Sequence, residues 1–393
     1  MRKRTLSLSN SDSYFLFGAR GTGKSTLIHS EITVDEGRVL WIDLLKSQEE
    51  QRYFDKPDLL SAQIDKERED LNWVVIDEVQ KVPKLLDVVH HEIEKTRRVG
   101  GSLRFALSGS SARKLKRSGA NLLAGRAIVH HLFPFTHQEL GEDFNLDQAV
   151  HSGTLPCILY HQDPRTQQAA LEAYVETYLK EEIVAEQLVR NVQPFRKFLN
   201  LCAKENGNIV NFHRIAEDLR IDGKTVKTYY DILEDTLLGF YLPAYDKSLR
   251  KQQLKSPKFY LFDCGVKRTL DPNLPESGPL SAQEFGLAFE HFILCEFFRI
   301  RSYQKRKMFF YHFNTGGSEI DLVIEAPRMQ TTFIEIKATE KVAEFHIKAL
   351  KRLRSAFPNY RYVCISQDPI ARIEDGVEIT PWQNAFKSIF SIP

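Results

Sequence analysis

Residues 18–25 read Gly18-Ala-Arg-Gly21-Thr-Gly23-Lys24-Ser25 and decide the fold of the N-terminal part of the chain. The apolar run Tyr14–Phe17 precedes them, and Thr26–His29 can open a helix after them. Glycines let a loop turn its N–H groups toward phosphate oxygens, and the helix N-terminus adds positive potential. We therefore predict a strand, a phosphate-binding loop and a helix that bind ATP through Gly18, Gly21, Thr22, Gly23, Lys24, Ser25 and Thr26. A glycine-rich turn without a ligand is the alternative.

A second motif, Trp73-Val-Val-Ile-Asp77-Glu78, is a β-branched run that ends in two acids. Such a run predicts a buried parallel strand with its carboxylates at the C-terminal edge of the sheet. There Asp77, together with the Ser25 hydroxyl, would hold Mg²⁺, and Glu78 would polarise the water that attacks the γ-phosphate. A buried strand capped by solvated acids is the other interpretation.

Further strands are expected at 39–42 and 103–107, with helices near 24–31 and 83–98. Together they predict an α/β fold with a doubly wound parallel sheet. The strand at 103–107 runs into Ser108-Gly-Ser110-Ser111, so Ser110 is a candidate sensor of the γ-phosphate. Arg113 and Arg126 are candidates for an arginine that completes the site of a neighbouring subunit, or they are structural or surface residues.

The bulk properties limit the alternatives. The chain has 393 residues, a net charge of +2 and five dispersed cysteines without a Cys-x-x-Cys pair. This predicts two or three domains, a reduced cytoplasmic location, and neither a disulfide framework nor a structural zinc site. The apolar stretch behind the basic N-terminus is too short for a signal peptide, and no stretch approaches a membrane helix in length.

The middle of the chain has the spacing of a helix-turn-helix. Helices are expected at 212–219 and 224–233, and two strands at 238–242 and 258–262 could form a wing. Lys224 and Lys227 would face outward, and the run from Lys247 to Lys258 holds five basic residues and no acid. The helices either contact DNA or form a winged-helix lid that packs on the ATPase, and the basic run is either a phosphate contact or a solvated loop.

The C-terminal part predicts a helix at 283–294, strands at 309–313, 319–325 and 332–337, a helix at 342–357 and a strand at 362–365. Glu290 interrupts the aromatic face of the first helix, and Asp321 lies inside an apolar strand. Glu335 and Lys337 share one face of the next strand. Asp321 and Glu335 could bind Mg²⁺ or Mn²⁺ as a carboxylate pair, with Lys337 orienting water or stabilising charge at phosphorus.

These motifs resemble known families. The order Gly-x4-Gly-Lys-Ser, Val-Val-Ile-Asp-Glu, Ser-Gly-Ser-Ser and Leu-Ala-Gly-Arg, followed by Pro-Phe and Glu139-Leu, is similar to a prokaryotic family of AAA-type ATPases whose C-terminal domain of unknown function is nuclease-like. Gly153-Thr-Leu-Pro156 matches a family element, but Cys157 stands where that family has an acid. Glu290, Asp321 and Glu335-x-Lys337 resemble the PD-(D/E)XK nuclease core, a restriction-endonuclease-like α/β fold. The resemblance implies a homo-oligomeric ring, with a hexamer favoured.

The sequence therefore predicts an AAA-type ATPase domain over 1–145, a helical and winged-helix-like region over 146–280, and a PD-(D/E)XK nuclease-like domain over 281–393. ATP turnover would be coupled to metal-dependent cleavage of DNA. The basic residues Arg299, Arg301, Lys305, Arg306 and Lys307 favour a surface that faces nucleic acid. The alternatives are an ATP-gated DNA-binding switch with an inactive nuclease-like domain, and an assembly regulator that needs no nucleic acid.

Overall fold

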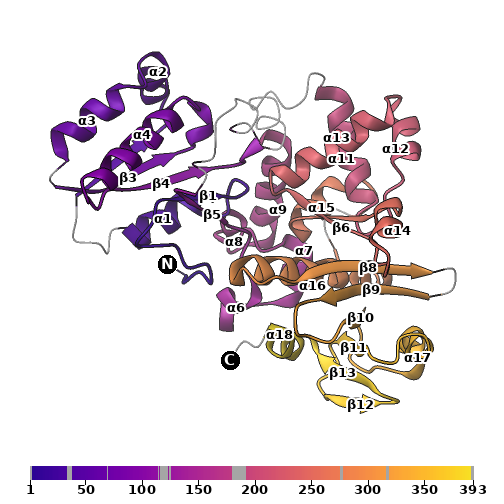
Figure 1. The fold of residues 1–393 in the computed structure, drawn as a ribbon. Coiled ribbons are helices and arrows are strands. Elements are labelled where there is room, and N and C mark those ends of the chain that lie inside the picture. Colours follow the sequence, from indigo (N-terminus) through magenta and orange to yellow (C-terminus); the bar gives the residue numbers. More distant parts are fainter. Residues whose placement is uncertain are drawn as a thin grey trace. The chain divides into compact units, whose positions relative to one another are not determined.

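The computed structural model describes residues 2–32, 38–68, 70–113, 115, 123, 125–178, 192–274, 278–315 and 318–390 (Figure 1). Contacts between residues divide the chain into two compact units. The first unit holds Met1–Phe135, Leu155–Tyr160 and Asp235–Leu238, and the second holds Thr136–Thr154, His161–Glu234 and Gly239–Pro393. The second unit thus contains most of the predicted middle region together with the predicted C-terminal domain.

The first unit is built on a five-stranded parallel sheet, which confirms the predicted α/β fold. Its strands, in spatial order, are β2 (Arg38–Asp43), β3 (Leu71–Asp77), β4 (Arg104–Gly109), β1 (Tyr14–Phe17) and β5 (Ile128–His131). The helical segments are α1 (Lys24–Ile32), α2 (Ser47–Asp55), α3 (Leu59–Glu67), η1 (Val79–Lys81), α4 (Leu85–Arg98) and α8 (Pro156–Leu159). All four residues of β1 are buried, as expected for a strand covered on both faces, and Phe15 and Phe17 stack on one another on one of these faces.

Strand β5 was not among the predicted strands. Its sequence, Ile-Val-His-His, is short and half polar, so its pattern does not predict a strand. The buried ring of His130 lies edge-on to Tyr14 at 5.8 Å between centroids, which makes it a core histidine of the sheet.

The second unit begins with helices. Its helical segments are α6 (His137–Leu140), η2 (Gly141–Asp143), α7 (Leu146–Ser152), α9 (Pro164–Ala173), η3 (Tyr174–Tyr178), α11 (Val192–Lys204), α12 (Phe212–Leu219), α13 (Gly223–Asp235), α14 (Leu249–Leu254) and α15 (Cys264–Leu270). Helices α12 and α13 lie where the spacing predicts them, and Asn211 caps α12 by accepting a hydrogen bond from Arg214 N–H. The strands β6 (Gly239–Leu242) and β7 (Lys258–Leu261) pair antiparallel, close to their predicted positions.

A six-stranded mixed sheet forms the rest of the second unit, in the order β12-β13-β11-β10-β9-β8. Its strands are β8 (Phe309–Thr315), β9 (Ser318–Glu325), β10 (Thr332–Lys337), β11 (Arg361–Ser366), β12 (Arg372–Glu374) and β13 (Val377–Pro381), and its helical segments are α16 (Ala282–Gln304), η4 (Glu344–His346), α17 (Lys348–Arg354) and α18 (Trp382–Phe390). The predicted order of helix, three strands, helix and strand is present. Helix α16 continues ten residues past the predicted end at Leu294, and a capping box of Ser281 and Glu284 fixes its start.

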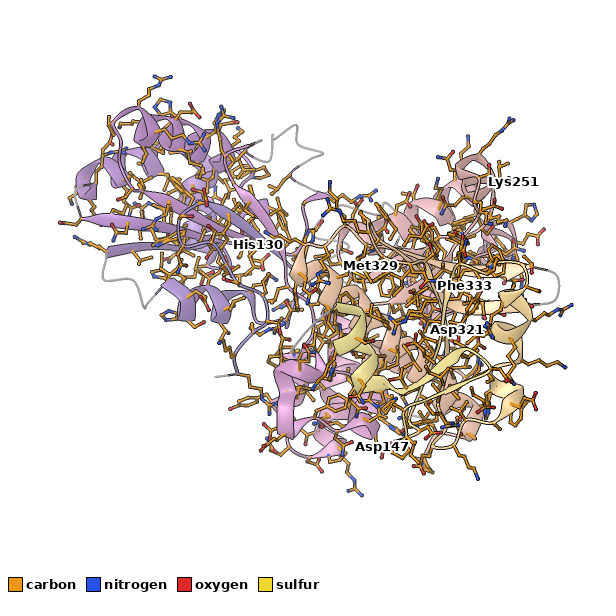
Figure 2. All side chains as sticks on the ribbon, turned by 60° about the horizontal axis from the view of Figure 1, so that its bottom comes forward. His130, Asp147, Lys251, Asp321, Met329 and Phe333 are labelled. Carbon is orange, nitrogen blue, oxygen red and sulfur yellow. The ribbon has the colours of Figure 1, made fainter. Side chains whose placement is uncertain are left out.

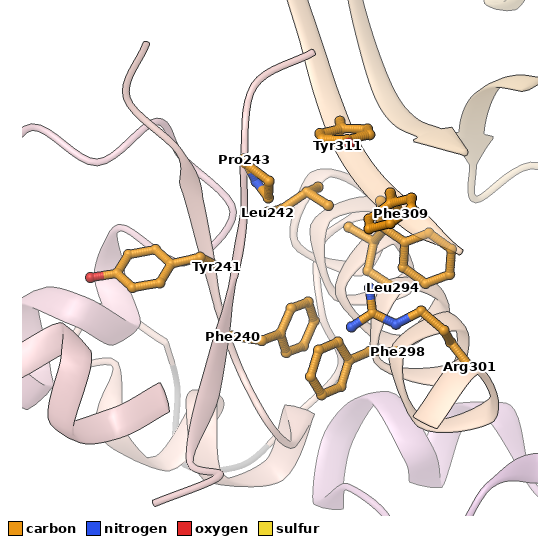
Figure 3. Close-up of a pocket in the computed structure, with 10 residues that line it drawn as sticks. Phe240, Tyr241, Leu242, Pro243, Leu294, Phe298, Arg301, Phe309 and Tyr311 are labelled. Atoms are coloured by element: carbon orange, nitrogen blue, oxygen red, sulfur yellow. The ribbon is translucent and has the colours of Figure 1, made fainter. Parts of the chain in front are cut away.

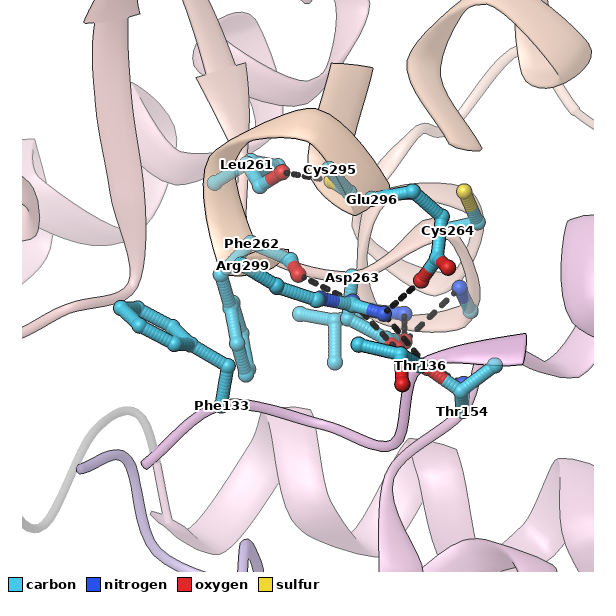
Figure 4. A network of polar contacts seen from close by, with 12 residues as sticks. Phe133, Thr136, Thr154, Leu261, Phe262, Asp263, Cys264, Cys295, Glu296 and Arg299 are labelled. Atoms are coloured by element: carbon cyan, nitrogen blue, oxygen red, sulfur yellow. Dashed lines mark hydrogen bonds and ion pairs between the residues drawn. The ribbon is translucent and has the colours of Figure 1, made fainter. Parts of the chain in front are cut away.

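A buried ionic network joins distant segments of the second unit (Figure 4). The Arg299 side chain, 3% exposed, donates to Thr154 Oγ1 at 2.9 Å and to the Phe262 carbonyl at 2.8 Å, and it lies 3.4 Å from Glu296. Asp263 caps α15 and also accepts the Thr154 N–H at 2.8 Å. Glu296 in turn accepts from the His137 N–H at 3.0 Å. The network therefore ties residues 136–154 to α15 and α16.

All five cysteines lie within the described residues, and none of them forms a disulfide bond there. Within the same residues, no helix has the length and apolar character needed to cross a membrane.

We expect Arg299→Met to destabilise the second unit by about 3–5 kcal/mol, because it leaves the carboxylates of Asp263 and Glu296 buried without their cation. Hydrogen exchange followed by mass spectrometry on peptides of α15 and α16 measures this loss. Arg306→Met, at an exposed position after α16, is the control and should change stability by less than about 0.5 kcal/mol. Equal effects of the two substitutions would contradict the role given to the network.

Candidate nucleotide and metal sites

The loop between β1 and α1 has the geometry of a phosphate-binding loop. Gly21 and Gly23 have φ values of 77° and 90°, which side chains other than glycine's rarely allow. Lys24 Nζ donates to the Gly18 carbonyl at 2.8 Å and lies 3.8 Å from the Glu78 carboxylate. Thr22 Oγ1 donates to the Ala19 carbonyl at 2.7 Å and braces the turn from inside, while Ser25 and Thr26 are exposed on the first turn of α1.

The two predicted nucleotide motifs meet at the end of β3. Ser25 Oγ donates to Asp77 Oδ2 at 2.6 Å, although 52 residues separate them. A hydroxyl and a carboxylate are the oxygen ligands that Mg²⁺ prefers in proteins, so this pair fits the cation that accompanies ATP.

Glu78 is held in an unusual backbone conformation. Its φ is 58°, in the left-handed region, and its N–H donates to Ser108 Oγ at 3.2 Å. The Ser108 hydroxyl also contacts Asp77, and Gln80 links the Glu78 carboxylate to Ser110, whose Oγ lies 3.1 Å from Gln80 Nε2. Strained backbone of this kind gathers at functional sites. The structure thus brings Ser110 into the network of Glu78, and it adds Ser108 and Gln80, which the motifs did not single out.

Both candidate arginines have acidic partners within the chain. Arg126 Nε is 2.5 Å from Glu94 Oε1, and Arg113 pairs with Asp235. Their assignment to a neighbouring subunit's site stays a prediction, and it requires these ion pairs to break.

Two contacts with the phosphate-binding loop come from residues far away in sequence. Arg4 Nη1 donates to the Thr22 carbonyl at 3.1 Å, and its Nη2 donates to the Phe133 carbonyl at 2.6 Å. The Cys157 N–H, on α8, donates to the Gly21 carbonyl at 3.3 Å. Cys157, which replaces the acid of the resembling family, is therefore an exposed thiol beside the loop. No local pattern predicts either contact.

The second candidate site lies where β9 and β10 separate. The two strands pair up to Leu322 and Ile334, so the next residues, Asp321 and Glu335, stand opposite each other on one face of the sheet. Asp321, labelled in Figure 2, replaces the missing backbone bond by accepting the Ile336 N–H at 2.7 Å. Lys337 Nζ lies 2.6 Å from Glu335 Oε1.

Burial and mutual repulsion make these acids hard to ionise. Burial, followed by the charge of Asp321, raises the pKa of Glu290 to about 7 and that of Glu335 to about 8. Burial also raises the pKa of Asp321. Burial opposes ionisation of Lys337, but the carboxylates of Asp321 and Glu335 raise its pKa. The three predicted acids and the predicted lysine are thus electrostatically coupled.

The carboxylate pair fits a divalent cation. Glu335 is buried, and its Oε2 has no hydrogen-bond partner among the residues that the structure describes, whereas Asp321 uses only Oδ2 for the Ile336 N–H. An unpartnered carboxylate oxygen in a buried acidic site is costly unless a cation binds it. Within the described ranges no group of three or more His, Cys, Asp or Glu residues could hold a metal ion. Binding of a cation by Asp321 and Glu335 as a pair stays a prediction.

Residues outside the predicted set also line this site. A pocket of about 400 Å³ next to Glu290 and Asp321 includes Lys258 and Tyr260 of β7 and Glu319 of β9. Tyr260 Oη donates to Glu290 Oε1 at 2.7 Å. Lys258 belongs to the basic run that we expected to be a solvated loop or a phosphate contact, but its side chain is 5% exposed.

The predicted basic surface after the first C-terminal helix is wrong for Arg299, which is buried in the ionic network, and both Arg299 and Arg301 belong to α16 itself. Arg301 lies over the rings of Phe298 and Phe310, 4.9 and 4.7 Å from their centroids, in a largely apolar pocket of about 150 Å³ (Figure 3). Lys305, Arg306 and Lys307 are exposed.

Comparison with protein families divides the chain in three. Residues 10–141 match a family model described as an AAA domain. Residues 143–277 and 285–385 match two domains of unknown function, DUF8612 and DUF4143. The first match and the loop geometry confirm an AAA-type P-loop domain at the N-terminal end.

The relatives found are uncharacterized proteins. One from Mycobacterium tuberculosis is 25% identical over 270 residues, which cover 68% of this chain and 58% of that protein. One from Haemophilus influenzae is 22% identical over 212 residues, covering 50% of this chain and 52% of that protein. The chain thus spans little more than half the length of the curated relatives that it matches.

Among solved structures, RuvB from Thermotoga maritima is 17% identical, with 64% of this chain and 84% of that chain covered and a TM-score of 0.30. The Aeropyrum pernix ORC1 protein, solved in complex with DNA, is 12% identical, with 66% and 86% covered and a TM-score of 0.27.

We expect Glu335→Gln to remove a pH dependence of stability. In the folded protein Glu335 keeps its proton up to a pKa of about 8, whereas in the unfolded chain a glutamate ionises above about 4.3. Between these two pH values the folded state binds more protons, so the free energy of unfolding falls as the pH rises. Urea unfolding from pH 5 to 9, without divalent ions, should show wild type losing stability relative to Glu335→Gln. Burial also lowers the pKa values of His291 and His312, to about 3 and about 4. Both proteins contain these histidines, so their contribution to the pH dependence cancels when the two stability curves are subtracted. Parallel curves would contradict the assignment.

Proposed function

We propose that this protein is an ATPase whose nucleotide cycle controls a metal-dependent nuclease site acting on DNA. The observation that carries the proposal is the gathering of Glu290, Asp321, Glu335 and Lys337 at one end of the second unit's sheet. It gives a chain with an AAA-type domain a second site of buried carboxylates and lysine, which is chemistry suited to phosphodiesters.

In the ATPase site, Lys24 would bind the β- and γ-phosphates, and Ser25 and Asp77 would hold Mg²⁺, which neutralises phosphate charge. Glu78 would orient the attacking water, and its link through Gln80 to Ser110 would make Ser110 responsive to the γ-phosphate. The restrained backbone of Glu78 limits where its carboxylate can point.

In the nuclease site, Asp321 and Glu335 would hold Mg²⁺ or Mn²⁺, which supplies positive charge to the phosphate. Lys337 would orient a water molecule whose oxygen bonds to phosphorus while a phosphorus–oxygen ester bond breaks. The departing oxygen takes up a proton and becomes a hydroxyl, and the other product is a phosphate monoester. Glu290 would be a third acid at the edge of this site, where its charge and that of Asp321 influence each other's ionisation.

DNA contact by the middle region belongs to the same proposal. Helix α13 exposes Lys224 and Lys227 at its start, consistent with a winged helix-turn-helix. A ring of subunits, with a hexamer favoured by the resemblance, would use Arg113 or Arg126 to complete a neighbour's ATP site.

One observation favours a second function, an ATP-gated DNA-binding switch that does not cut. Lys337 is already paired with Glu335, and the buried Lys258 lies 2.8 Å from Glu319, so both ammonium groups have carboxylate partners within the chain. A site whose charges are neutralised in this way is consistent with a nuclease-like domain that binds DNA without cleaving it.

We expect Glu78→Gln to retain ATP but to hydrolyse it at least about 100-fold more slowly, because the amide cannot polarise water. Binding of a fluorescent ATP analogue and release of phosphate measure the two effects. Glu31→Gln, at an exposed position on α1, is the matched control and should behave like wild type. Undiminished hydrolysis would remove Glu78 from its role.

We expect Asp321→Ala to abolish cleavage of plasmid DNA in Mg²⁺ or Mn²⁺, since it removes one of two cation ligands. Agarose gels of supercoiled, nicked and linear forms report the result. Asp147→Asn, an exposed acid labelled in Figure 2, serves as the control. Equal inactivity of wild type and Asp321→Ala would leave the binding switch as the better function.

A further inference from the structure

Strand β7 carries a lysine into the carboxylate site. Lys258 Nζ lies 2.8 Å from Glu319 Oε1 and 4.0 Å from Glu290 Oε1. Residues two apart in a strand share a face, and Tyr260 accordingly also points to Glu290 and donates to it at 2.7 Å. The intervening Phe259 packs the other way, its ring 4.8 Å from that of Tyr230 on α13. The alternation of β7 therefore aims Lys258 and Tyr260 at the acids.

A neighbouring segment of the middle region fixes β7 in this orientation. The N–H groups of Gly207 and Val210 donate to the carbonyls of Phe259 and Pro257 at 2.9 and 2.8 Å. Asn206 Oδ1 accepts the Leu261 N–H at 2.7 Å. Gly207 has a φ of 82°, and a Cβ there would stand 3.1 Å from the Tyr260 ring. Glycine thus lets this segment lie directly against the residue that holds Glu290.

The pocket that results combines groups for a cation and for an anion. The pocket has a volume of about 400 Å³, and its lining includes the carboxylates of Glu290, Glu319 and Asp321, the ammonium of Lys258 and the amides of Asn206, Asn208 and Asn314. Carboxylates suit a divalent cation, whereas ammonium and amide N–H groups suit phosphate oxygens. Glu335 does not line this pocket, but it stands opposite Asp321 on the next strand, and its buried Oε2 has no hydrogen-bond partner among the described residues. This orphan oxygen is a second, independent sign that the carboxylate site takes a cation.

We propose that Lys258 has two roles in the carboxylate site. It binds the phosphate of a nucleic acid, and its positive charge weakens the binding of the divalent cation. The inference rests on the proposed function for the nature of the ligand. It adds a residue supplied by the middle region, outside the helix–strand–strand pattern that predicted the site.

The two roles have opposite signs when Lys258 is removed. Loss of one positive charge within a few ångströms of the ligands should tighten Mn²⁺ binding by about tenfold or more. Loss of a phosphate contact should weaken the binding of DNA. A residue with only a structural role would weaken both, because its loss would loosen the site.

The experiment compares the full chain with Lys258→Met, Lys258→Arg and the control Lys255→Met. Lys255 lies three residues away, is 40% exposed and pairs with Asp246. Calorimetry with Mn²⁺ alone measures the cation, and fluorescence anisotropy with a labelled single-stranded oligonucleotide in Ca²⁺ measures the phosphate contact. We expect Lys258→Met to bind Mn²⁺ about tenfold or more tightly and the oligonucleotide about tenfold or more weakly. Lys258→Arg and Lys255→Met should stay close to wild type.

Equal or weaker Mn²⁺ binding by Lys258→Met overturns the inference, as does an absence of Mn²⁺ binding in every protein. Unchanged oligonucleotide binding also overturns it. If Lys258→Met unfolds, tighter Mn²⁺ binding by Lys258→Gln supports the inference and unchanged binding overturns it. Failure of the proposed nuclease looks different, because wild type then leaves plasmid uncut while the opposite shifts of Mn²⁺ and oligonucleotide binding persist.

Discussion

The arrangement of the second unit depends on the contacts of one buried group, the guanidinium of Arg299. It holds a hydroxyl of the 136–154 segment, a carbonyl at the end of β7 and a carboxylate of its own helix in one place. Asp263 extends this by capping α15 and binding Thr154 N–H at once. Since β7 and α16 carry Lys258, Tyr260 and Glu290, the geometry of the carboxylate site follows from the position of this network.

The two candidate sites solve the problem of charge differently. The nucleotide site keeps its acids near the surface and satisfies them with serine hydroxyls, an arrangement compatible with a ligand that comes and goes. The carboxylate site instead buries acids beside one another, so that their negative charge is offset by protonation or by neighbouring lysines. Such a site lowers stability, and proteins tolerate that loss where function requires it.

The sequence predicts what local spacing determines. The phosphate-binding loop, the acids after β3 and the alternation of Glu335 with Lys337 are properties of short segments, and the structure has them on the expected elements. Contacts made by tertiary pairing were missed. Arg4 and Cys157 lie 18 and 136 residues from Thr22 and Gly21. Lys258 belongs to a basic run that indicates a phosphate contact or a solvated loop, and nothing in that run connects it to the carboxylates of the later strands. Arg299 was misjudged because a basic residue suggests solvent unless its acidic partners, here Asp263 and Glu296, are known.

The bonds between residues 206–210 and β7 bear on how this protein can be divided. Family boundaries place Lys258 and Glu290 in different modules, separated near residue 280, yet one pocket wall comes from each. A fragment starting at that boundary would keep every acid of the site but lose the lysine, the tyrosine and the glycine-shaped wall. A chimera that exchanges only the C-terminal module between relatives would therefore contain only part of the pocket lining. The preceding module would have to be exchanged together with it.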